Sequence, residues 1–190
     1  MAKNRGDLST EGRTLGRMAR VYDLVCTLGG LGTGFKRRIV ELAQLKRDDR
    51  VLDVGCGTGV LTRLAGERAQ EVAGIDAAPE MIAVARSKAE REGLDIDFRP
   101  ALIEDLPYPD SHFDVVLSSL MVHHLPPAVK LSGLREVLRV LKTGGRFILV
   151  DFDRAGKLPG LLREAGFAEV RSLGKAWLLG IISLWEARRS

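Results

Sequence analysis

The stretch VLDVGCGTG, residues 51–59, is an apolar segment that runs directly into a loop with glycine at every second position. Glycine permits positive φ angles and lets a ligand approach the main chain closely. A helix-compatible segment, residues 60–68, follows the loop. A strand, a glycine-rich loop and a helix in this order are typical of a nucleoside-cofactor site at the carboxyl end of a parallel sheet.

The spacing of acids and glycines narrows the choice of cofactor. Asp76 lies 17 residues after Gly59 at the expected end of the next strand, where a carboxylate can bind both ribose hydroxyls. The dinucleotide pattern GxGxxG needs a third glycine where this chain has Val60, and no Gly-Lys-Ser/Thr follows to make a P-loop. Asp53 would repel a pyrophosphate but suits the ammonium group of a methionine moiety. We therefore expect S-adenosylmethionine as the cofactor.

The rest of the core alternates between strand-like and helix-like segments, which predicts an α/β fold with a parallel sheet covered by helices. Strands are expected at 51–54, 71–75, 96–99, 113–118 and 146–151, and helices at 60–68, 79–91, 127–141 and 158–165. Residues 167–188 are expected to form two further strands joined around Gly174–Lys175.

Two segments with helical spacing, residues 15–27 and 35–45, precede this core and are separated by a glycine-rich joint. We expect a single domain over 1–190, in which an N-terminal helical cap, 1–46, covers a cofactor-binding core, 47–190.

These features resemble class I S-adenosylmethionine-dependent methyltransferases, especially the branch that includes the ubiquinone and menaquinone biosynthesis enzymes. The resemblance rests on residues 51–59, Asp76 with Met81, residues 106–110 leading into 113–116, residues 136–145 leading into Asp151, and the upstream residues 21–24. It implies a doubly wound, Rossmann-like sheet of seven mostly parallel strands whose last strand is antiparallel. The expected cofactor-binding residues are Asp53, Gly55, Cys56, Gly57, Gly59, Asp76, Ala77, Met81, Leu102, Ile103 and Ser118.

Two departures from the family pattern bear on the site. Family members carry an acid four residues before the Leu-Pro pair that begins at Leu106, and this chain has Leu102 there. The adenine is therefore expected to rely on apolar packing and the backbone N–H of Ile103, with Glu104 or Asp105 as the alternative acceptor. Quinone-pathway relatives also carry a long insertion after the fifth strand, which this chain lacks, so we expect a more open substrate site or a different lid.

Methyl transfer needs an acceptor held in line with the methyl group, and a phenol or acidic carbon also benefits from a base. His123 and His124 follow the fourth expected strand, where such a base is expected. His124 is our choice, because His123 is closer to the strand and more prone to pack. Tyr22 is a further candidate, lying over the cofactor as part of the cap. Each of these side chains also has an ordinary packing role as its alternative.

Composition limits the remaining possibilities. The net charge of +4, 45% apolar residues and 5% aromatic residues describe a globular chain without the basic and aromatic pattern of nucleic-acid binding. Two cysteines and three histidines suggest neither a disulfide framework nor a metal site. No signal sequence or membrane span is expected, so a cytoplasmic protein is the expectation. Basic clusters leave peripheral membrane contact open, and the oligomeric state is left undetermined.

We expect methyl transfer to a small hydrophobic or amphiphilic acceptor, with C- or O-methylation of a quinone-like or phenolic metabolite as the first interpretation. N-methylation of an amine, such as a phospholipid headgroup, is the alternative. A non-catalytic S-adenosylmethionine-binding protein is the alternative of another class.

Overall fold

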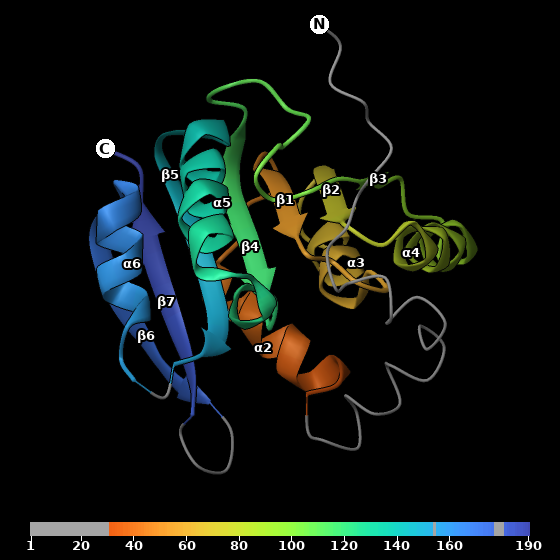
Figure 1. Ribbon diagram of the computed structural model, residues 1–190. Coiled ribbons are helices and arrows are strands. Elements are labelled where there is room, and N and C mark those ends of the chain that lie inside the picture. The colour runs from red at the N-terminus through yellow and green to blue at the C-terminus, as the bar shows by residue number, and fades with distance from the viewer. Residues whose placement is uncertain (1–30, 154, 177–180) are drawn as a thin grey trace, which may run out of the picture.

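The computed structural model describes residues 31–153, 155–176 and 181–190. Within them, seven strands form one sheet in the order β3-β2-β1-β4-β5-β7-β6 (Figure 1). The strands are β1 (Arg50–Val54), β2 (Glu71–Asp76), β3 (Asp97–Pro100), β4 (Phe113–Ser119), β5 (Leu141–Phe152), β6 (Ala168–Ala176) and β7 (Ile182–Arg188). Only β7 runs antiparallel to its neighbours, β5 and β6, in this described sheet. The predicted doubly wound sheet with an antiparallel last strand is confirmed.

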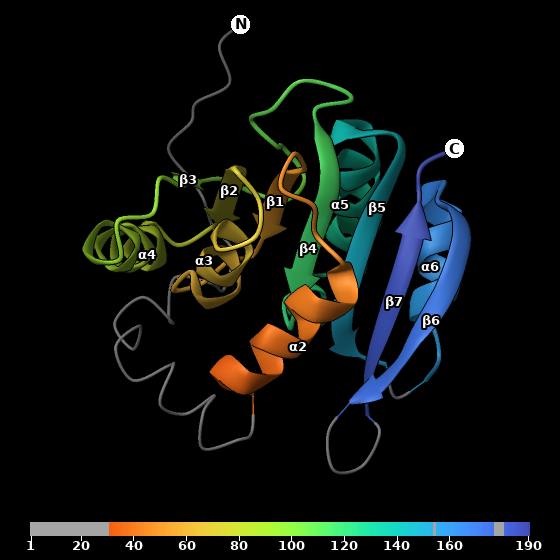
Figure 2. The same ribbon diagram turned by 180° about the vertical axis from the view of Figure 1, so that it is seen from behind.

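Helices cover both faces of this sheet. They are α2 (Thr33–Ala43), α3 (Val60–Gly66), α4 (Pro79–Arg91), α5 (Pro127–Val140) and α6 (Leu158–Ala165), with a short 3₁₀ turn, η3 (Val122–His124). Helices α5 and α6 lie on one face and α2 and α3 on the other, as the two opposite views show (Figures 1 and 2). Helix α4 packs beside β3 and β2 at the edge of the sheet. None of the helices in the described part of the chain is long and apolar enough to cross a bilayer.

The central strands are mostly apolar because both of their faces are covered. In β1, Val51 belongs to the apolar cluster under α2 and α3, and Leu52 to the cluster under α5 and α6. Side chains alternate between the faces of a strand, so a strand buried on both faces has to be apolar at successive positions. This explains why a short run such as residues 51–54 lies in the middle of the sheet.

Two of the expected boundaries are wrong. Strand β5 begins at Leu141, directly after α5, because Leu141 pairs with Phe113 across the sheet. Gly174 does not form the turn between the last strands. It has φ +123° and lies at an irregularity within β6, where it pairs with Leu184 of β7. Strand β6 continues to Ala176, beyond the expected joint.

The N-terminal expectations are tested only in part. The expected helix 35–45 is observed as α2, two residues earlier than predicted. The other expected helix, 15–27, lies outside the described residues, and so does most of the expected cap.

Candidate functional site

The glycine loop between β1 and α3 is fastened to the neighbouring strand β2. The backbone N–H groups of Gly55 and Cys56 both donate to the carbonyl oxygen of Ile75, each at 2.9 Å. The N–H of Gly59 donates to the carbonyl of Cys56 at 3.0 Å, which closes the turn. The loop is therefore held at the carboxyl ends of β1 and β2, where the sequence predicted it.

Two glycines of this loop serve different purposes. Gly59 has φ +76°, and a Cβ at this position would lie 2.9 Å from Cβ of Ala85 and 3.0 Å from the Phe98 ring. Gly57 has φ +54°, and a Cβ there would have nothing within 4 Å. Gly59 thus permits the packing of α3 against α4 and β3, whereas Gly57 faces open space where a ligand can approach the main chain.

Asp76 holds this loop from the end of β2. Its carboxylate accepts hydrogen bonds from the N–H groups of Gly57 and Ala78, both at 2.9 Å. Burial raises the pKa of Asp76, although both hydrogen bonds oppose that shift. Each carboxylate oxygen has two acceptor sites, so Asp76 retains capacity for a ligand diol after binding these two N–H groups.

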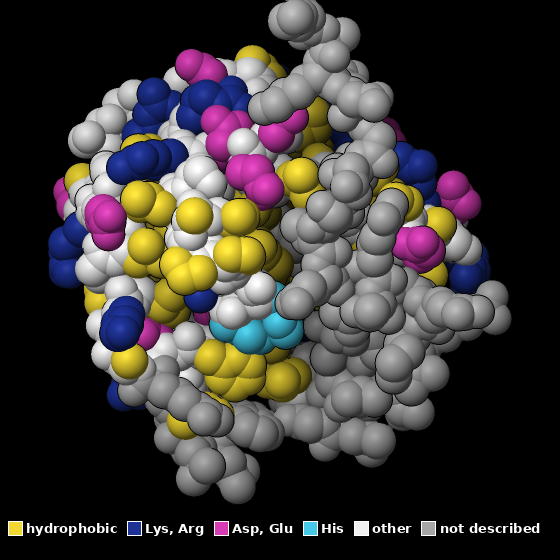
Figure 3. All heavy atoms as spheres, viewed as in Figure 1, with side chains coloured by type: hydrophobic (Ala, Val, Ile, Leu, Met, Phe, Trp, Pro, Cys, Tyr) yellow, Lys and Arg dark blue, Asp and Glu magenta, His cyan; other side chains and the backbone are white. Residues whose placement is uncertain are grey.

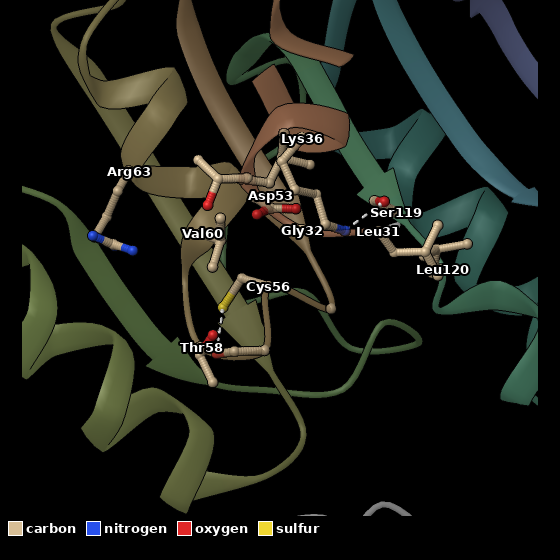
Figure 4. Close-up of a pocket in the computed structure, with 14 residues that line it drawn as sticks. Leu31, Gly32, Lys36, Asp53, Cys56, Thr58, Val60, Arg63, Ser119 and Leu120 are labelled. Carbon is tan, nitrogen blue, oxygen red and sulfur yellow. Dashed lines mark hydrogen bonds between the residues drawn. The ribbon is translucent and has the colours of Figure 1, made fainter. Parts of the chain in front are cut away.

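A cavity opens beside the loop, between α2 and α3 (Figure 4). Its polar side chains include Asp53 from β1, Lys36 from α2 and Ser119 from β4. Asp53 is only 1% exposed, and its Oδ2 accepts a hydrogen bond from Thr62 Oγ1 at 2.6 Å. Burial raises the pKa of Asp53 to about 6, while the Thr62 hydrogen bond and the Lys36 charge act in the opposite direction.

Cys56 also lines the cavity, with its side chain buried. Burial raises the pKa of its thiol, and the neighbouring charges of Asp53 and Asp76 add to this effect. A thiol of raised pKa stays protonated at neutral pH and is a poor nucleophile. Cys56 therefore contributes shape to the cavity wall rather than reactivity.

The end of β4 completes the cavity through an unusual backbone conformation. Leu120 has φ +58°, which is rare for a side chain of this size, and its N–H donates to the carbonyl of Val150 at 2.8 Å. Met121 then turns back onto Gly55, close enough to fill the space of a Cβ there. Strained residues of this kind are concentrated at functional sites.

This turn places Ser119 in the cavity instead of the expected Ser118. Ser119 and Leu120 line the cavity, whereas Ser118 is fully buried and its Oγ has no hydrogen-bond partner among the described residues. Because side chains alternate along a strand, neighbouring serines point to opposite faces. The structure thus gives no support to Ser118 as a cofactor ligand.

His123 in η3 is tied to Asp151 at the end of β5. Its Nδ1 lies 2.5 Å from Oδ1 of Asp151, and its backbone N–H donates to Oδ2 of the same carboxylate at 3.2 Å. The ring of Phe152 meets the His123 ring edge-on, with the centroids 4.9 Å apart. The imidazole is therefore fixed in orientation while its side chain remains 27% exposed.

His124 is more exposed than His123, and within the described residues its side chain forms no hydrogen bond or ion pair with a carboxylate. Its ring centroid is 3.8 Å from that of His123. Burial lowers the pKa of His124, the charge of His123 lowers it further, and Asp151 partly opposes both. Histidine side chains form one exposed patch where η3 lies, and hydrophobic side chains border this patch above and below (Figure 3). Asp151 is thus the hydrogen-bond partner of His123 and not of His124, the histidine that we expected to be the base.

The residues expected to bind adenine lie near Asp76 but do not line the cavity. Met81 is buried in α4, Ala77 is half-buried, and Leu102 is half-buried in the loop after β3. Ile103 is buried, and its side chain fills the space next to Gly133 of α5. That packing makes Ile103 a core residue by its side chain, which leaves only its main chain for a ligand.

Two remaining expectations can be stated briefly. Tyr22 lies outside the described residues. Within the described ranges, no group of three or more His, Cys, Asp or Glu side chains is arranged to hold a metal ion.

Known proteins share both this sequence pattern and this fold. Residues 51–145 match the family model of a methyltransferase domain. The chain belongs to the methyltransferase family. Its sheet order and the position of its glycine loop agree with this membership, and S-adenosylmethionine is the cofactor that the family implies.

Relatives from quinone biosynthesis are among the similar proteins. The chain is 41% identical over 135 residues to a demethylmenaquinone methyltransferase of Thermus thermophilus, covering 69% of this chain and 60% of that protein. It is 38% identical over 168 residues to the ubiquinone/menaquinone biosynthesis C-methyltransferase UbiE of Azotobacter vinelandii, covering 83% of this chain and 65% of that protein. The crystal structure of YcgJ from Bacillus subtilis aligns with a TM-score of 0.65 and 28% identity, over 73% of this chain and 70% of that one. The chain spans less than two thirds of the length of either quinone-pathway relative. The identities of 41% and 38% confirm its resemblance to that branch.

Sequence reasoning missed two members of the site. Lys36 belongs to a basic cluster that was interpreted as a solvated helix face or a site of membrane contact, and Asp151 was named only among the residues that carry the family resemblance. Both make contacts with residues far away in the sequence, Ser119 and His123, which no local pattern reveals.

Proposed function

We propose that this chain transfers the methyl group of S-adenosylmethionine to a small hydrophobic or amphiphilic acceptor, by C- or O-methylation of a phenolic or quinone-like compound. The observation that carries the proposal is the hydrogen-bonded pair of His123 and Asp151 at the carboxyl ends of β4 and β5. These ends lie next to the glycine loop, because β4 pairs directly with β1. A fixed imidazole beside a methyl-donor site is suited to remove a proton from an acidic acceptor.

The residues present fit the cofactor. The open side of Gly57 admits a ligand to the main chain, and Asp76 offers its carboxylate to the ribose hydroxyls. Asp53 offers a buried carboxylate to the ammonium group of the methionine moiety. When bound, the cofactor supplies a methyl group activated by its positively charged sulfur. The chain itself binds and orients the reactants, excludes water and supplies a base for the acceptor.

In this proposal His123 is the base. Asp151 accepts the Nδ1 hydrogen, which leaves the Nε2 lone pair to take the proton from a phenolic oxygen or an acidic ring carbon. Asp151 then stabilises the imidazolium that forms. A positioned base of this kind contributes about 10²–10⁴-fold to rate.

The basic clusters in the described residues do not favour the alternative hypothesis, N-methylation of an amine such as a phospholipid headgroup. Five side chains of these clusters take part in ion pairs with nearby acids, which is how solvated basic residues behave. The pairs are Arg37 with Glu67, Arg38 with Glu41, Arg139 with Glu136 and Asp110, Lys142 with Asp114, and Arg188 with Glu169. Phenolic and quinone-like acceptors therefore remain the first choice.

The test is release of S-adenosylhomocysteine from the purified chain with matched sets of acceptors. One set holds demethylated quinones and simple phenols, and the other holds primary amines and vesicles of phosphatidylethanolamine. We expect product only with the first set, with the methylated atom assigned by NMR. Product only with amines would overturn the acceptor class. Cofactor binding without turnover on either set would favour the non-catalytic alternative.

A further inference from the structure

The loop between β3 and β4, residues 101–112, is held by two side chains of α5 (Figures 1 and 2). Arg139 donates through Nη1 to the carbonyl oxygen of Tyr108 at 2.9 Å, and through Nη2 to that of Leu106 at 3.1 Å. Glu136, three residues earlier on α5, accepts the N–H of Leu106 at 3.1 Å. Side chains of one helix thus bind both the N–H and the carbonyl group of Leu106.

Arg139 and Glu136 are also joined to each other. Nε of Arg139 donates to Oε1 of Glu136 at 2.7 Å, and Nη2 donates to Oε2 at 2.8 Å. These hydrogen bonds hold the pKa of Glu136 below its usual value, although burial opposes them, so the carboxylate stays ionised at neutral pH. A two-bonded pair of this kind has a defined orientation, which a single exposed ion pair lacks. The pair is therefore suited to fix the position of main-chain groups.

The beginning of the same loop is held at two further points. A Cβ at Gly133 of α5 would lie 2.8 Å from two side-chain carbon atoms of Ile103, so the glycine makes room for the loop against the helix. The N–H of Ala101 donates to the carbonyl oxygen of Asp76 at 3.0 Å. The loop thus begins beside Asp76, at the end of β2, and continues along α5 to the contacts with Arg139.

A nucleoside whose ribose is bound by Asp76 has its base attached to the same ribose, and the start of this loop is the neighbouring main chain. We propose that Arg139 and Glu136 are positioning residues, which hold the loop so that the N–H of Ile103 is directed at the base of the cofactor. The proposal rests on the proposed function, because the base belongs to the cofactor of that reaction. Neither side chain is among those that line the cavity, so both act through the main chain of the loop.

The expected consequence is discrimination between bases. Adenine has a hydrogen-bond acceptor at N1, whereas hypoxanthine carries a hydrogen atom there. A main-chain N–H that is fixed opposite N1 therefore gains a partner from adenine and none from hypoxanthine. A loop that is free to shift can adjust to either base, so its preference is smaller.

The test compares S-adenosylhomocysteine with S-inosylhomocysteine, in which hypoxanthine replaces adenine. Calorimetry on the full chain measures both affinities, and we expect the parent chain to prefer the adenine ligand by about tenfold or more. Arg139→Met removes both contacts with the loop carbonyls and should reduce this preference by about threefold or more. Arg139→Lys keeps the charge but lacks the planar group that reaches two carbonyls. It should reduce the preference in the same direction and is measured in parallel in case the methionine variant fails to fold.

The matched control is Arg135→Met, which removes the same charge from an exposed position of the same helix and should leave the preference unchanged. Equal losses for both ligands in the Arg139 variants, or no loss for either ligand, would overturn the proposal, since a purely structural role does not distinguish the bases. A reduced preference in Arg135→Met would overturn it too, because the charge of α5 and not the loop contacts would then be responsible. A parent chain that binds both ligands equally refutes this inference alone, whereas one that binds neither refutes the proposed function.

Discussion

The imidazole of His123 and the carboxylate of Asp151 are joined at 2.5 Å, and the carboxylate has no solvent exposure. Two backbone N–H groups, those of His123 and Phe152, donate to the same carboxylate at 3.2 and 2.7 Å. Three hydrogen bonds thus fix Asp151, and Asp151 in turn fixes the ring. This chain of contacts orients one imidazole nitrogen toward the carboxylate and leaves the other for an acceptor.

Replacing either partner should slow methyl transfer without impairing cofactor binding. We expect His123→Ala to lower kcat by about 10²–10⁴-fold, the usual contribution of a positioned base. Asp151→Asn keeps the size of the side chain but removes the charge that stabilises the imidazolium, so we expect a loss of about tenfold or more. Single-turnover rates with a phenolic acceptor measure both effects, and calorimetry with S-adenosylhomocysteine checks binding.

His124→Ala is the matched control for this prediction. Its ring lies beside that of His123 but does not share the contact with Asp151, so turnover should stay within a few-fold of the parent. A hundredfold loss in His124→Ala together with an active His123→Ala would reassign the base to His124, as the sequence first suggested. Full activity in both variants would mean that proximity alone carries the reaction.

The two glycines of the cofactor loop allow a second matched comparison. Gly59→Ala would place a methyl group 2.9 Å from Ala85 and against Phe98, at a positive φ. We expect a loss of about 2–4 kcal/mol in the free energy of unfolding, because overpacking and backbone strain add. Gly57→Ala has room for its methyl group, so it should cost only about 1 kcal/mol, from the positive φ. Chemical denaturation of both variants measures the difference.

Cofactor binding should distinguish the same two variants. The methyl group of Gly57→Ala enters the open space where a ligand would meet the main chain, so affinity for S-adenosylhomocysteine should fall at least as far as in Gly59→Ala. Unchanged affinity in Gly57→Ala would show that the cofactor does not approach the loop at this point.

Local sequence patterns predicted the fold well because they depend on neighbouring residues. The alternation of strand-like and helix-like segments predicted elements that the structure contains with small shifts. The turn predicted at Gly174 was wrong, because a glycine is typical of turns and of strand bulges alike. Only the pairing of Gly174 with β7 shows that it belongs to a strand irregularity.

The site was less predictable, because its contacts join distant segments. His123 and Asp151 are 28 residues apart, and Lys36 and Ser119 are 83 apart. Ser119 was not among the expected residues, because its place in the cavity depends on the backbone of Leu120, whose positive φ has no sequence signal. Charge and residue type identified some of the site residues, but tertiary packing decides which of these residues contact one another.

Leu102 offers a third test, at the adenine end. The family acid is replaced here by a half-buried leucine in the loop after β3, whose first residues are held by the carbonyl of Asp76 through the N–H of Ala101. Leu102→Asp should add an acceptor for the adenine amino group and tighten cofactor binding by roughly 1 kcal/mol, about fivefold. Calorimetry on Leu102→Asp and on Leu102→Ala, which adds no acceptor, measures the gain. Unfolding of the aspartate variant would instead identify Leu102 as a core residue.

Asp53 provides the last prediction, in which stability and binding change in opposite directions. Burial raises its pKa to about 6 in the folded chain, whereas an unfolded aspartate titrates near about 3.9. The folded state therefore holds the proton more tightly, and the contribution of Asp53 to stability falls as the pH rises from about 4 to about 6. Asp53→Asn should remove this slope and raise the free energy of unfolding at pH 7 by on the order of 1 kcal/mol. At pH 4 the two proteins should be about equally stable.

The same substitution should weaken cofactor binding, because the amide has no charge to offer the ammonium group of the ligand. We expect a loss of about tenfold or more at pH 7. In the parent chain, affinity should also decline as the pH falls below about 6, since a proton then competes for the carboxylate, and this decline should be absent from Asp53→Asn. Thermal denaturation and calorimetry between pH 4 and 8 measure both effects, with the exposed Asp95→Asn as the control. A variant that is less stable at pH 7 would show that the Thr62 and Lys36 contacts outweigh the cost of burial, and equal affinity would remove Asp53 from the cofactor site.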